Sequence, residues 1–342
     1  MESPPSQGAI AAHPPAASAI ALAEAERLEA QQGRGANPFA GILWMALASL
    51  LFAVMNVLAR LASARVPWTE VAAFRALVGA GTALGFALVR RAPLRIDPAD
   101  RKLAWGRALC GTVAMLCTFL TLGAPLLALG DVVTLGATST IFVALLSPRM
   151  LGERSSRGLW AATLLAFSGV AMVAGPQLRL AGHLALIATT GAFASALAMI
   201  WLRKLGSSAQ RDRSRPGPGP EAVALHFSLV ASVVMVVLSI PTFQVPDATG
   251  ALLLFITGLT GGMAQLAMTR AYALDRAARI GTVGYLGVVL SHVFGVVGLG
   301  EAPGPHQLLG ALLVTAAGVG LAAEALRDKY GTGTVQKARG QG

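Results

Sequence analysis

The triplet Leu151-Gly152-Glu153 returns 148 residues later as Leu299-Gly300-Glu301. With this offset held constant, residues 131–153 align with residues 279–301 and share five identities in 23 positions. An apolar composition gives roughly two such identities by chance, so the count alone only suggests a repeat. Together with the second occurrence of the triplet, these identities predict an internal repeat of a unit of about 140–150 residues.

The composition indicates a membrane protein. Apolar residues make up 55% of the 342 residues and charged residues only 13%, against about 25% charged in an ordinary soluble domain. Such a chain, with a mean hydropathy of +0.64, cannot cover its surface with polar groups, so we expect lipid as its solvent. The net charge of +11 stands in short basic clusters between apolar runs. Membrane topology explains that pattern better than a phosphate-binding face, so we expect no nucleic-acid partner.

Catalytic and cofactor chemistry has no signal in the sequence. The two cysteines, Cys110 and Cys117, lie seven residues apart in one apolar run, too far apart along a helix to form a disulfide. No zinc-ligand spacing and no Ser-His or Asp-Asp pair at matched depth occurs. We therefore expect no enzyme activity, no cofactor and no metal.

Ten apolar runs long enough to cross a bilayer follow one another from Gly41 onward, since a spanning helix needs about 20 residues. The runs are continuously apolar rather than alternating, which excludes strands as spans. The fold class is therefore expected to be all-α and membrane-integral. The expected spans are 41–62, 70–89, 103–124, 130–148, 157–175, 182–202, 221–242, 249–270, 280–299 and 306–326.

Lysine and arginine give the expected orientation, because cytoplasmic loops carry an excess of both. With the N-terminus inside, 23 of the 27 Lys and Arg residues fall on the cytoplasmic side, Arg107 among them. Arg60, Arg65 and Arg179 stay outside, and Arg75 lies just within its span. We therefore expect a multi-pass protein of the inner (plasma) membrane with both termini in the cytoplasm.

Each repeat carries five spans, an odd number, so the second repeat must enter the membrane upside down relative to the first. The first repeat is expected at 39–176 and the second at 177–326. Residues 1–38 are rich in Ala, Pro, Gln and Gly and are expected to form a disordered cytoplasmic tail. Residues 327–342 form the C-terminal cytoplasmic tail in this scheme. A proline- and glycine-rich cytoplasmic loop is expected at 204–220.

These features together resemble the EamA branch of the drug/metabolite transporter superfamily, over residues 40–326. The resemblance rests on two five-span repeats, Phe74-Arg75 early in the second span, the two Leu-Gly-Glu triplets, and the glycines 169, 310 and 318 in the helices that follow them. It implies a transporter of small organic solutes. It also implies that spans one, three, four, six, eight and nine line a central cavity.

The fourth and ninth spans depart from this family in one respect. Members often carry proline in the middle of both spans, whereas here the positions hold Thr138, Ser139 and Thr140 in one and Gly281, Gly284 and Gly287 in the other. We therefore expect the interruptions of these two helices to be less sharp than in other members. The glycine face of the ninth span is expected either to pack against a neighbouring helix or to form the floor of the pocket. The pairs Gly81/Gly85 and Gly258/Gly262 are expected to pack helices closely within the monomer, with a dimer seam as the alternative.

Three charged residues are candidates for gating or structural roles. Glu153 and Glu301 each follow a glycine at a helix end, beside the free amides of the next helix. A carboxylate there favours the positive end of the helix dipole, so capping is expected rather than substrate contact. Arg75 lies about one turn inside the second span, where a charge must snorkel or pair. Glu70 is its candidate partner, and structural anchoring and an outer gate stay open as its roles.

Polar side chains deep in the apolar runs turn toward protein or water, so they mark the interior. Hydroxyl groups often bond to their own helix, which makes Asn56, Gln265, Tyr285 and His292 the stronger candidates. His292 shares a helix face with Tyr285 and is the only mid-membrane group that titrates near neutral pH. The full set of candidate substrate-binding residues is Trp44, Asn56, Thr118, Thr138, Ser195, Gln265, Tyr285 and His292.

The sequence therefore predicts a transporter that moves a metabolite, amino acid, vitamin or drug-like solute by alternating access through a central cavity. Its expected partners are that solute and membrane lipid, and the chain is expected to act as a monomer or a homodimer. The alternative is a membrane scaffold or receptor that transports nothing. An intramembrane enzyme is less favoured, because it would need paired catalytic groups.

Overall fold

The computed structural model describes residues 39–152, 157–207, 217–302 and 304–320. This described part is almost entirely helical and contains no strand, which agrees with the expected all-α class. Its elements are α2 (Ala40–Ser63), α3 (Trp68–Arg90), α4 (Arg101–Leu122), α5 (Leu129–Gly136), α6 (Thr138–Leu151), α7 (Arg157–Gly206), α9 (Pro220–Ser239), the short 3₁₀ helix η1 (Ile240–Thr242), α10 (Ala248–Leu274), α11 (Ala277–Val283) and α12 (Leu286–Leu299), and a further helix at residues 305–320. Both expected tails lie outside the described residues.

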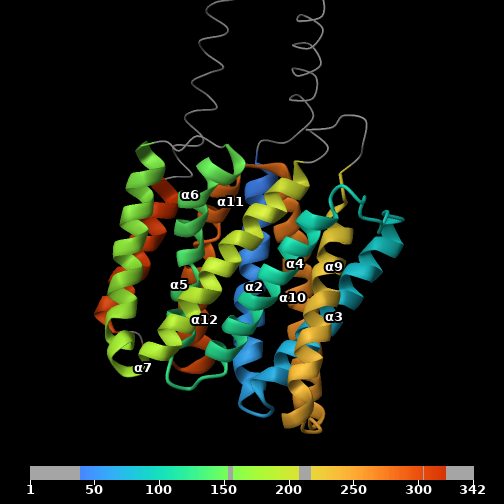
Figure 1. Ribbon diagram of the computed structural model, residues 1–342. Helices are drawn as coiled ribbons and strands as arrows, with labels where there is room; N and C mark the ends of the chain where they lie inside the picture. Colours follow the sequence, from blue (N-terminus) through green and yellow to red (C-terminus); the bar gives the residue numbers. More distant parts are fainter. Residues whose placement is uncertain (1–38, 153–156, 208–216, 303, 321–342) are drawn as a thin grey trace, which may run out of the picture. The chain divides into compact units, whose positions relative to one another are not determined.

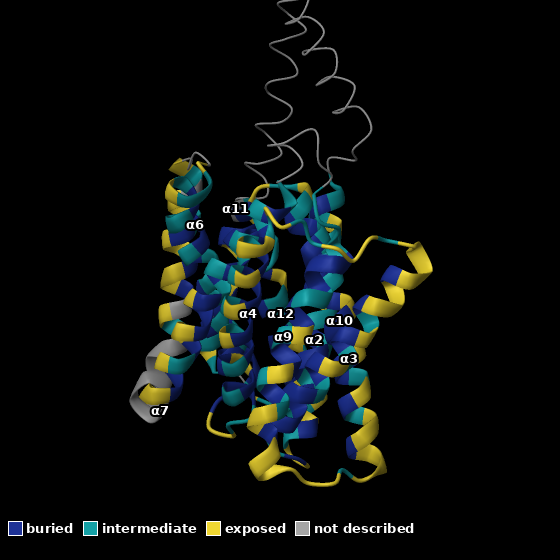
Figure 2. Cartoon of the chain, turned by 45° about the vertical axis from the view of Figure 1, so that its right-hand side comes forward, coloured by how far each residue is buried: buried dark blue, intermediate teal, exposed yellow. Residues whose placement is uncertain are grey.

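Eight stretches of the described chain are long and apolar enough to cross a membrane, judged by length and composition. Each matches one expected span to within a few residues, so the chain is a multi-pass membrane protein. The eight stretches are Ala40–Ser63, Trp68–Arg90, Arg101–Leu122, Leu129–Leu151, Gly182–Gly206, Pro220–Thr242, Ala248–Leu274 and Arg279–Leu299. Large apolar side chains stay exposed on these helices, and Figure 2 shows exposed positions recurring along them among buried ones. Lipid is the solvent that tolerates such a surface.

The expected fifth and tenth spans are not among these eight stretches. The fifth lies in α7, a single 50-residue helix that also contains the expected sixth span. The interval between the expected fifth and sixth spans is helical as well, and its segment Gln177–Ala181 consists mainly of good helix formers. Figure 1 shows α7 doubling back, so that its two arms run in opposite directions. The tenth span is helical from 305 to 320 and then leaves the described part of the chain.

Two helices are interrupted at positions 148 residues apart. The first interruption separates α5 from α6 at Ala137, and the second separates α11 from α12 at Gly284 and Tyr285. Neither break needs proline, because tighter hydrogen bonds to the third preceding residue carry the chain through, such as Tyr285 N–H to Thr282 O at 3.1 Å. The pairs also end alike, with Gly152 at φ 69° and Gly300 at φ 67°, a left-handed conformation that favours glycine.

The two interrupted pairs lie against each other. Helix α5 packs on α12 and α6 packs on α11. In Figure 1, α6 lies above α5, whereas α11 lies above α12. The chain therefore rises from α5 to α6 and descends from α11 to α12, so the two pairs point in opposite directions. The two pairs therefore share an offset of 148 residues, an interruption and a cap geometry.

Small residues let the helices approach closely. A Cβ on Gly262 would lie 2.8 Å from Thr82 Cβ, and one on Gly258 would lie 3.0 Å from Phe74 O, so both glycines pack α10 tightly on α3. The expected tight packing is confirmed for this pair. It is wrong for Gly81 and Gly85, because a Cβ on either would meet no described atom within 4 Å. Those two glycines lie on the part of α3 that its neighbours leave open.

Candidate functional site

A cavity of about 290 Å³ lies among the helices of the compact unit Gly41–Gly342. Its walls come from α2, α3, α4, α5, α6, α7, α9, α10, α11 and α12. The walls include the helices of the six spans that the family resemblance implied, and the second and seventh spans add Arg75 and Phe227. Four of the expected substrate-binding residues line this cavity: Asn56, Thr118, Ser195 and Gln265.

These four polar side chains differ in how much of their hydrogen bonding the protein already satisfies. Thr118 Oγ1 donates to Ala114 O at 2.8 Å, which is a bond within its own helix. Gln265 is buried, and its Nε2 donates to Thr269 Oγ1 at 3.4 Å. Thr118 therefore presents mainly its methyl group and a spare acceptor to the cavity, whereas the Gln265 amide keeps hydrogen-bonding capacity for a ligand.

Two arginines also line the cavity, and sequence reasoning found only one of them. Arg75 on α3 is 4% exposed and Arg107 on α4 is 2% exposed. The expectation that counted Arg107 among the cytoplasmic charges is wrong, because residue 107 lies inside α4 with its side chain buried. Arg107 is one of several basic residues near the start of its span, so the sequence alone gives no sign that its side chain is buried. Arg75 likewise lines the central cavity.

Glu70 is not the partner of Arg75 in this structure. Its Oε1 accepts a hydrogen bond from Gln244 N–H at 2.6 Å. The nearest polar contact of Arg75 is from Nη1 to Met115 Sδ at 3.3 Å. The guanidinium also lies 5.6 Å from the centre of the Phe227 ring. A thioether and an aromatic face are weak partners for a buried cation.

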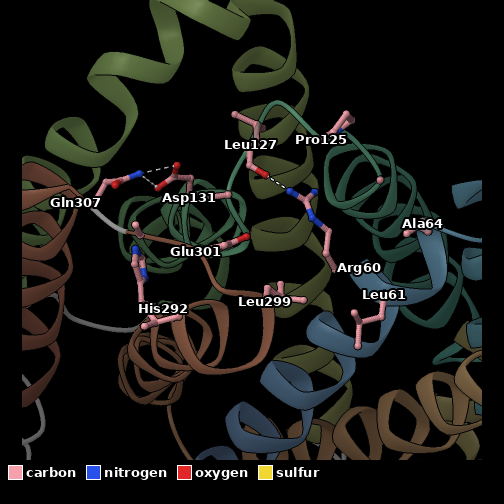
Figure 3. A pocket seen from close by; sticks show the side chains of 16 residues that line it. Arg60, Leu61, Ala64, Pro125, Leu127, Asp131, His292, Leu299, Glu301 and Gln307 are labelled. Atoms are coloured by element: carbon pink, nitrogen blue, oxygen red, sulfur yellow. Dashed lines mark hydrogen bonds between the residues drawn. The ribbon is translucent and has the colours of Figure 1, made fainter.

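A second pocket, of about 780 Å³, lies where the α4–α5 turn meets the end of α12, and Figure 3 shows it from close by. Arg60 points into the turn and donates to Leu122 O at 2.6 Å and Ala124 O at 2.8 Å, as well as to Leu127 O. Its guanidinium therefore holds three backbone carbonyls together. On the opposite side, Gln307 Nε2 donates to both carboxylate oxygens of Asp131 at 2.9 Å.

Glu301 acts as a helix cap in this second pocket. Its Oε1 accepts a hydrogen bond from Leu129 N–H at 2.8 Å, at the first residue of α5. The helix that Glu301 caps is α5, and not, as expected, the helix that follows Glu301. The two segments are 172 residues apart in the sequence, so no local pattern could identify the partner. Glu153, the matching residue of the first repeat, lies outside the described residues.

The other four expected substrate-binding residues do not line the central cavity. Trp44 lies near the start of α2, with the Arg270 guanidinium 5.1 Å from its ring centre. Thr138 Oγ1 donates to Leu135 O at 2.7 Å. Tyr285 is buried in a small apolar cluster with Ala166 and Val314.

His292 lines the second pocket instead of the central cavity. Its Nδ1 lies 3.0 Å from Val288 O, and its ring lies against Gly130, where a Cβ would be 2.6 Å from Nε2. The shared helix face of Tyr285 and His292 therefore does not bring both side chains to one ligand site. Their roles in substrate binding stay predictions.

The glycines of the ninth span serve both packing and the pocket. Gly281 and Gly284 line the central cavity. A Cβ on Gly281 would lie 3.2 Å from Thr140 Cγ2, and one on Gly284 would lie 3.0 Å from Met45 Cε. A larger residue at either position would push α11 away from α6 or α2. Among the described residues, no group of three or more His, Cys, Asp or Glu side chains is placed to hold a metal ion.

The chain is similar to proteins named as transporters. Residues 39–175 match the model of the EamA-like transporter family. Over 283 residues, the chain is 28% identical to the pseudopaline exporter CntI of Pseudomonas aeruginosa, covering 82% of this chain and 95% of the relative. It is 24% identical to a riboflavin transporter of Vibrio cholerae, covering 81% of this chain and 91% of the relative. A solved crystal structure shares the fold with a TM-score of 0.64 and 20% identity, over 85% of this chain and 99% of the other.

Proposed function

We propose that this chain, an EamA-type protein of the drug/metabolite transporter superfamily and not an enzyme, is a transporter. It moves a small organic solute across the inner membrane by alternating access. The central cavity carries the proposal. It lies among helices from both halves of the chain, and Asn56, Ser195 and Gln265 give it polar groups at membrane depth. Such groups are costly among apolar helices unless they serve a solute or water.

The interrupted helices supply a physical basis for alternating access. The α5–α6 and α11–α12 pairs share an offset, a break and a cap, and they pack on each other in opposite directions. If the two halves are inverted repeats of five spans each, exchanging their conformations converts an opening at one face into an opening at the other. Breaks held by 3₁₀-type bonds rather than by proline would let each helix bend there at low cost.

The proposed topology has ten spans, with both termini and the expected loop 204–220 in the cytoplasm. The helices α7 and α9 extend into that loop and leave residues 207–219 between them. The distribution of Lys and Arg supports it, as does the doubling back of α7, which gives the fifth and sixth spans. A protease-sensitive tag inserted in the 207–219 segment should resist external protease in intact cells. Cleavage from outside would invert the topology.

Counterflow tests the transport proposal directly. Liposomes containing the purified protein would be loaded with a panel of amino acids, vitamins including riboflavin, and drug-like amines, and the uptake of each labelled compound would be measured. The proposal predicts saturable exchange for at least one class of compound. A scaffold or receptor would give no exchange above that of empty liposomes.

The chain offers a matched pair of variants for this assay. Gly136 lines the central cavity, and Gly81 does not; a Cβ on either would meet no described atom within 4 Å. Gly136→Leu should therefore fill the cavity and abolish counterflow, whereas Gly81→Leu should leave it intact. Equal activity of both variants would place the solute path elsewhere.

A further inference from the structure

The two cavity arginines have no anionic partner within the described part of the chain. No carboxylate there lies within 4.0 Å of the Arg75 or Arg107 guanidinium, and the Nε of each is buried without a hydrogen-bond partner. A buried charge normally costs several kcal/mol unless it is paired and hydrogen-bonded. Two such charges beside one cavity are therefore not explained by the stability of the fold.

The carboxylates of the bundle that could have served as partners are engaged elsewhere. Glu221 lies 3.4 Å from Arg90 and 3.5 Å from Arg270. Glu70 accepts from Gln244 N–H, and Glu301 accepts from Leu129 N–H. The protein thus has acidic groups for its other buried contacts and places none of them beside the cavity arginines.

Both guanidinium groups are seated by specific neighbours. The ring of Phe227 lies between α3 and α4, with its centre 4.3 Å from Arg107 Cζ and 5.6 Å from Arg75 Cζ. A Cβ on Gly111 would clash with Arg107 Nη1, and a Cβ on Gly261 would lie 3.1 Å from Arg75 Nε. Each arginine therefore occupies space that only glycine leaves open. The aromatic ring restrains the cations but cannot neutralise them.

We propose that Arg75 and Arg107 form an anion-binding subsite, and that the solute is a small organic anion whose carboxylate or phosphate group these two guanidiniums hold. This inference rests on the proposed transport function, since the subsite lies in the same cavity. A guanidinium matches the oxygens of either oxyanion bidentately. The cavity volume of about 290 Å³ limits the solute to a small metabolite. The amides of Asn56 and Gln265 line the same cavity and can hydrogen-bond the rest of the molecule.

Thermal unfolding of the purified full-length protein tests the subsite with simple anions in place of the transported solute. The probes are succinate, glycerol 3-phosphate, glycerol and choline, each at matched ionic strength set with sodium chloride. The proposal predicts that succinate, glycerol 3-phosphate or both raise the melting temperature, and that glycerol and choline do not. The more effective of the two anions identifies the oxyanion. Stabilisation by chloride alone to the same extent would show a structural counter-ion and overturn the proposal.

Variants connect the response to the two arginines. Arg107→Gln and Arg75→Gln should each weaken binding of the effective anion about tenfold or more, because each removes a charged hydrogen-bonding partner. Arg65→Gln is the matched control, since Arg65 is exposed and pairs with Asp247 at 2.9 Å. It should bind the anion like the parent. An unchanged affinity in both cavity variants would overturn the proposal.

Two further measurements distinguish a lost anion site from a misfolded protein if an arginine variant binds no anion. In buffer without organic anion, Arg107→Gln should melt no lower than the parent, because it removes an uncompensated buried charge. A lower melting temperature would show that the protein itself uses the charge and would contradict the subsite. Gly111→Ala keeps the charge and displaces it, so it should weaken anion binding in the same direction as Arg107→Gln.

The outcomes separate this inference from the transport proposal. If an anion binds through both arginines but gives no counterflow, the subsite stands and the transport function fails. If a neutral or cationic compound is exchanged equally by the parent and by both arginine variants, transport stands and the anionic solute is wrong.

Discussion

Arg60 and Arg107 are both arginines on membrane-spanning helices, yet the protein surrounds them in opposite ways. Arg60 donates to three backbone carbonyls at the turn between α4 and α5. Arg107 is 2% exposed, its Cζ lies 4.3 Å from the centre of the Phe227 ring, and its Nε has no hydrogen-bond partner among the described residues. The first is a structural cation that the backbone satisfies. The second has no anionic partner in the described part of the chain, and we propose that it binds the solute.

The difference teaches that the two pockets serve different purposes. At the second pocket, Arg60, Glu301 and Gln307 each join segments that are distant in the sequence, and their polar atoms are used in doing so. At the central cavity, Thr118 bonds within its own helix and Thr140 donates to Gly281 O, but the buried Nε atoms of Arg75 and Arg107 have no hydrogen-bond partner among the described residues. Substitutions in the second pocket should therefore act on stability, and those in the central cavity on binding.

The largest expected effect is the loss of stability in Arg60→Gln. A glutamine side chain cannot reach three carbonyls, and each buried acceptor left unpaired costs about 1–3 kcal/mol. We expect a much lower melting temperature and less folded protein, with normal counterflow per folded molecule. Thermal unfolding and counterflow of the same preparation measure both. Normal stability with lost transport would reverse the contrast between the two arginines.

A smaller loss is expected for Glu301→Ala. The Glu301 side chain caps the first amide of α5 and places a negative charge at the start of that helix. The substitution removes both the cap and the charge. Loss of such a cap costs about 0.5–2 kcal/mol. Glu301→Gln keeps an acceptor without the charge and should lose less, as thermal unfolding of the three proteins would show. A Glu301→Ala variant as stable as the parent would mean that the cap contributes nothing.

Gln265 lines the central cavity with an amide, whereas His292 lines the second pocket with an imidazole. Gln265→Ala should reduce transport about tenfold, the size expected for one lost hydrogen bond to a charged or polar ligand. His292→Ala should change transport less, since His292 lines the second pocket. Counterflow rates per folded molecule of the two variants measure this difference. A larger loss in His292→Ala would restore the assignment of His292 to the substrate site.

The smallest effect is expected for Thr118→Val. The hydroxyl already donates to Ala114 O within its own helix, so its loss removes little from a ligand, and valine keeps the shape. We expect a transport rate within about threefold of the parent. A drop as large as that of Gln265→Ala would show that this hydroxyl contacts the solute.

The fold was largely predictable because span length and apolar composition are local properties. The eight apolar stretches lie where continuous hydrophobic runs place them, and the Leu-Gly-Glu triplets mark two left-handed caps. The continuation of α7 as one helix between its two arms was not predicted, because the two expected spans end at 175 and begin at 182.

The site was predictable only in part, because cavity lining depends on how helices rotate against each other. Asn56 and Gln265 were found as polar residues at membrane depth. Tyr285 satisfied the same rule, yet it packs in an apolar cluster. Arg107 was missed because a basic residue near the start of a span normally snorkels to the membrane surface. Its burial follows from Gly111 and Phe227, whose positions only the packed structure reveals.

Labelling of the central cavity from each face of the membrane tests alternating access most directly. Ser195 lines the cavity, so Ser195→Cys in a background with Cys110→Ser and Cys117→Ser gives a single thiol there. Proteoliposomes of known orientation would be exposed to a membrane-impermeant thiol reagent from one side at a time. Alternating access predicts labelling from either side, with a transported solute slowing both reactions. Labelling from one side only, unaffected by any solute that the protein exchanges, would contradict it.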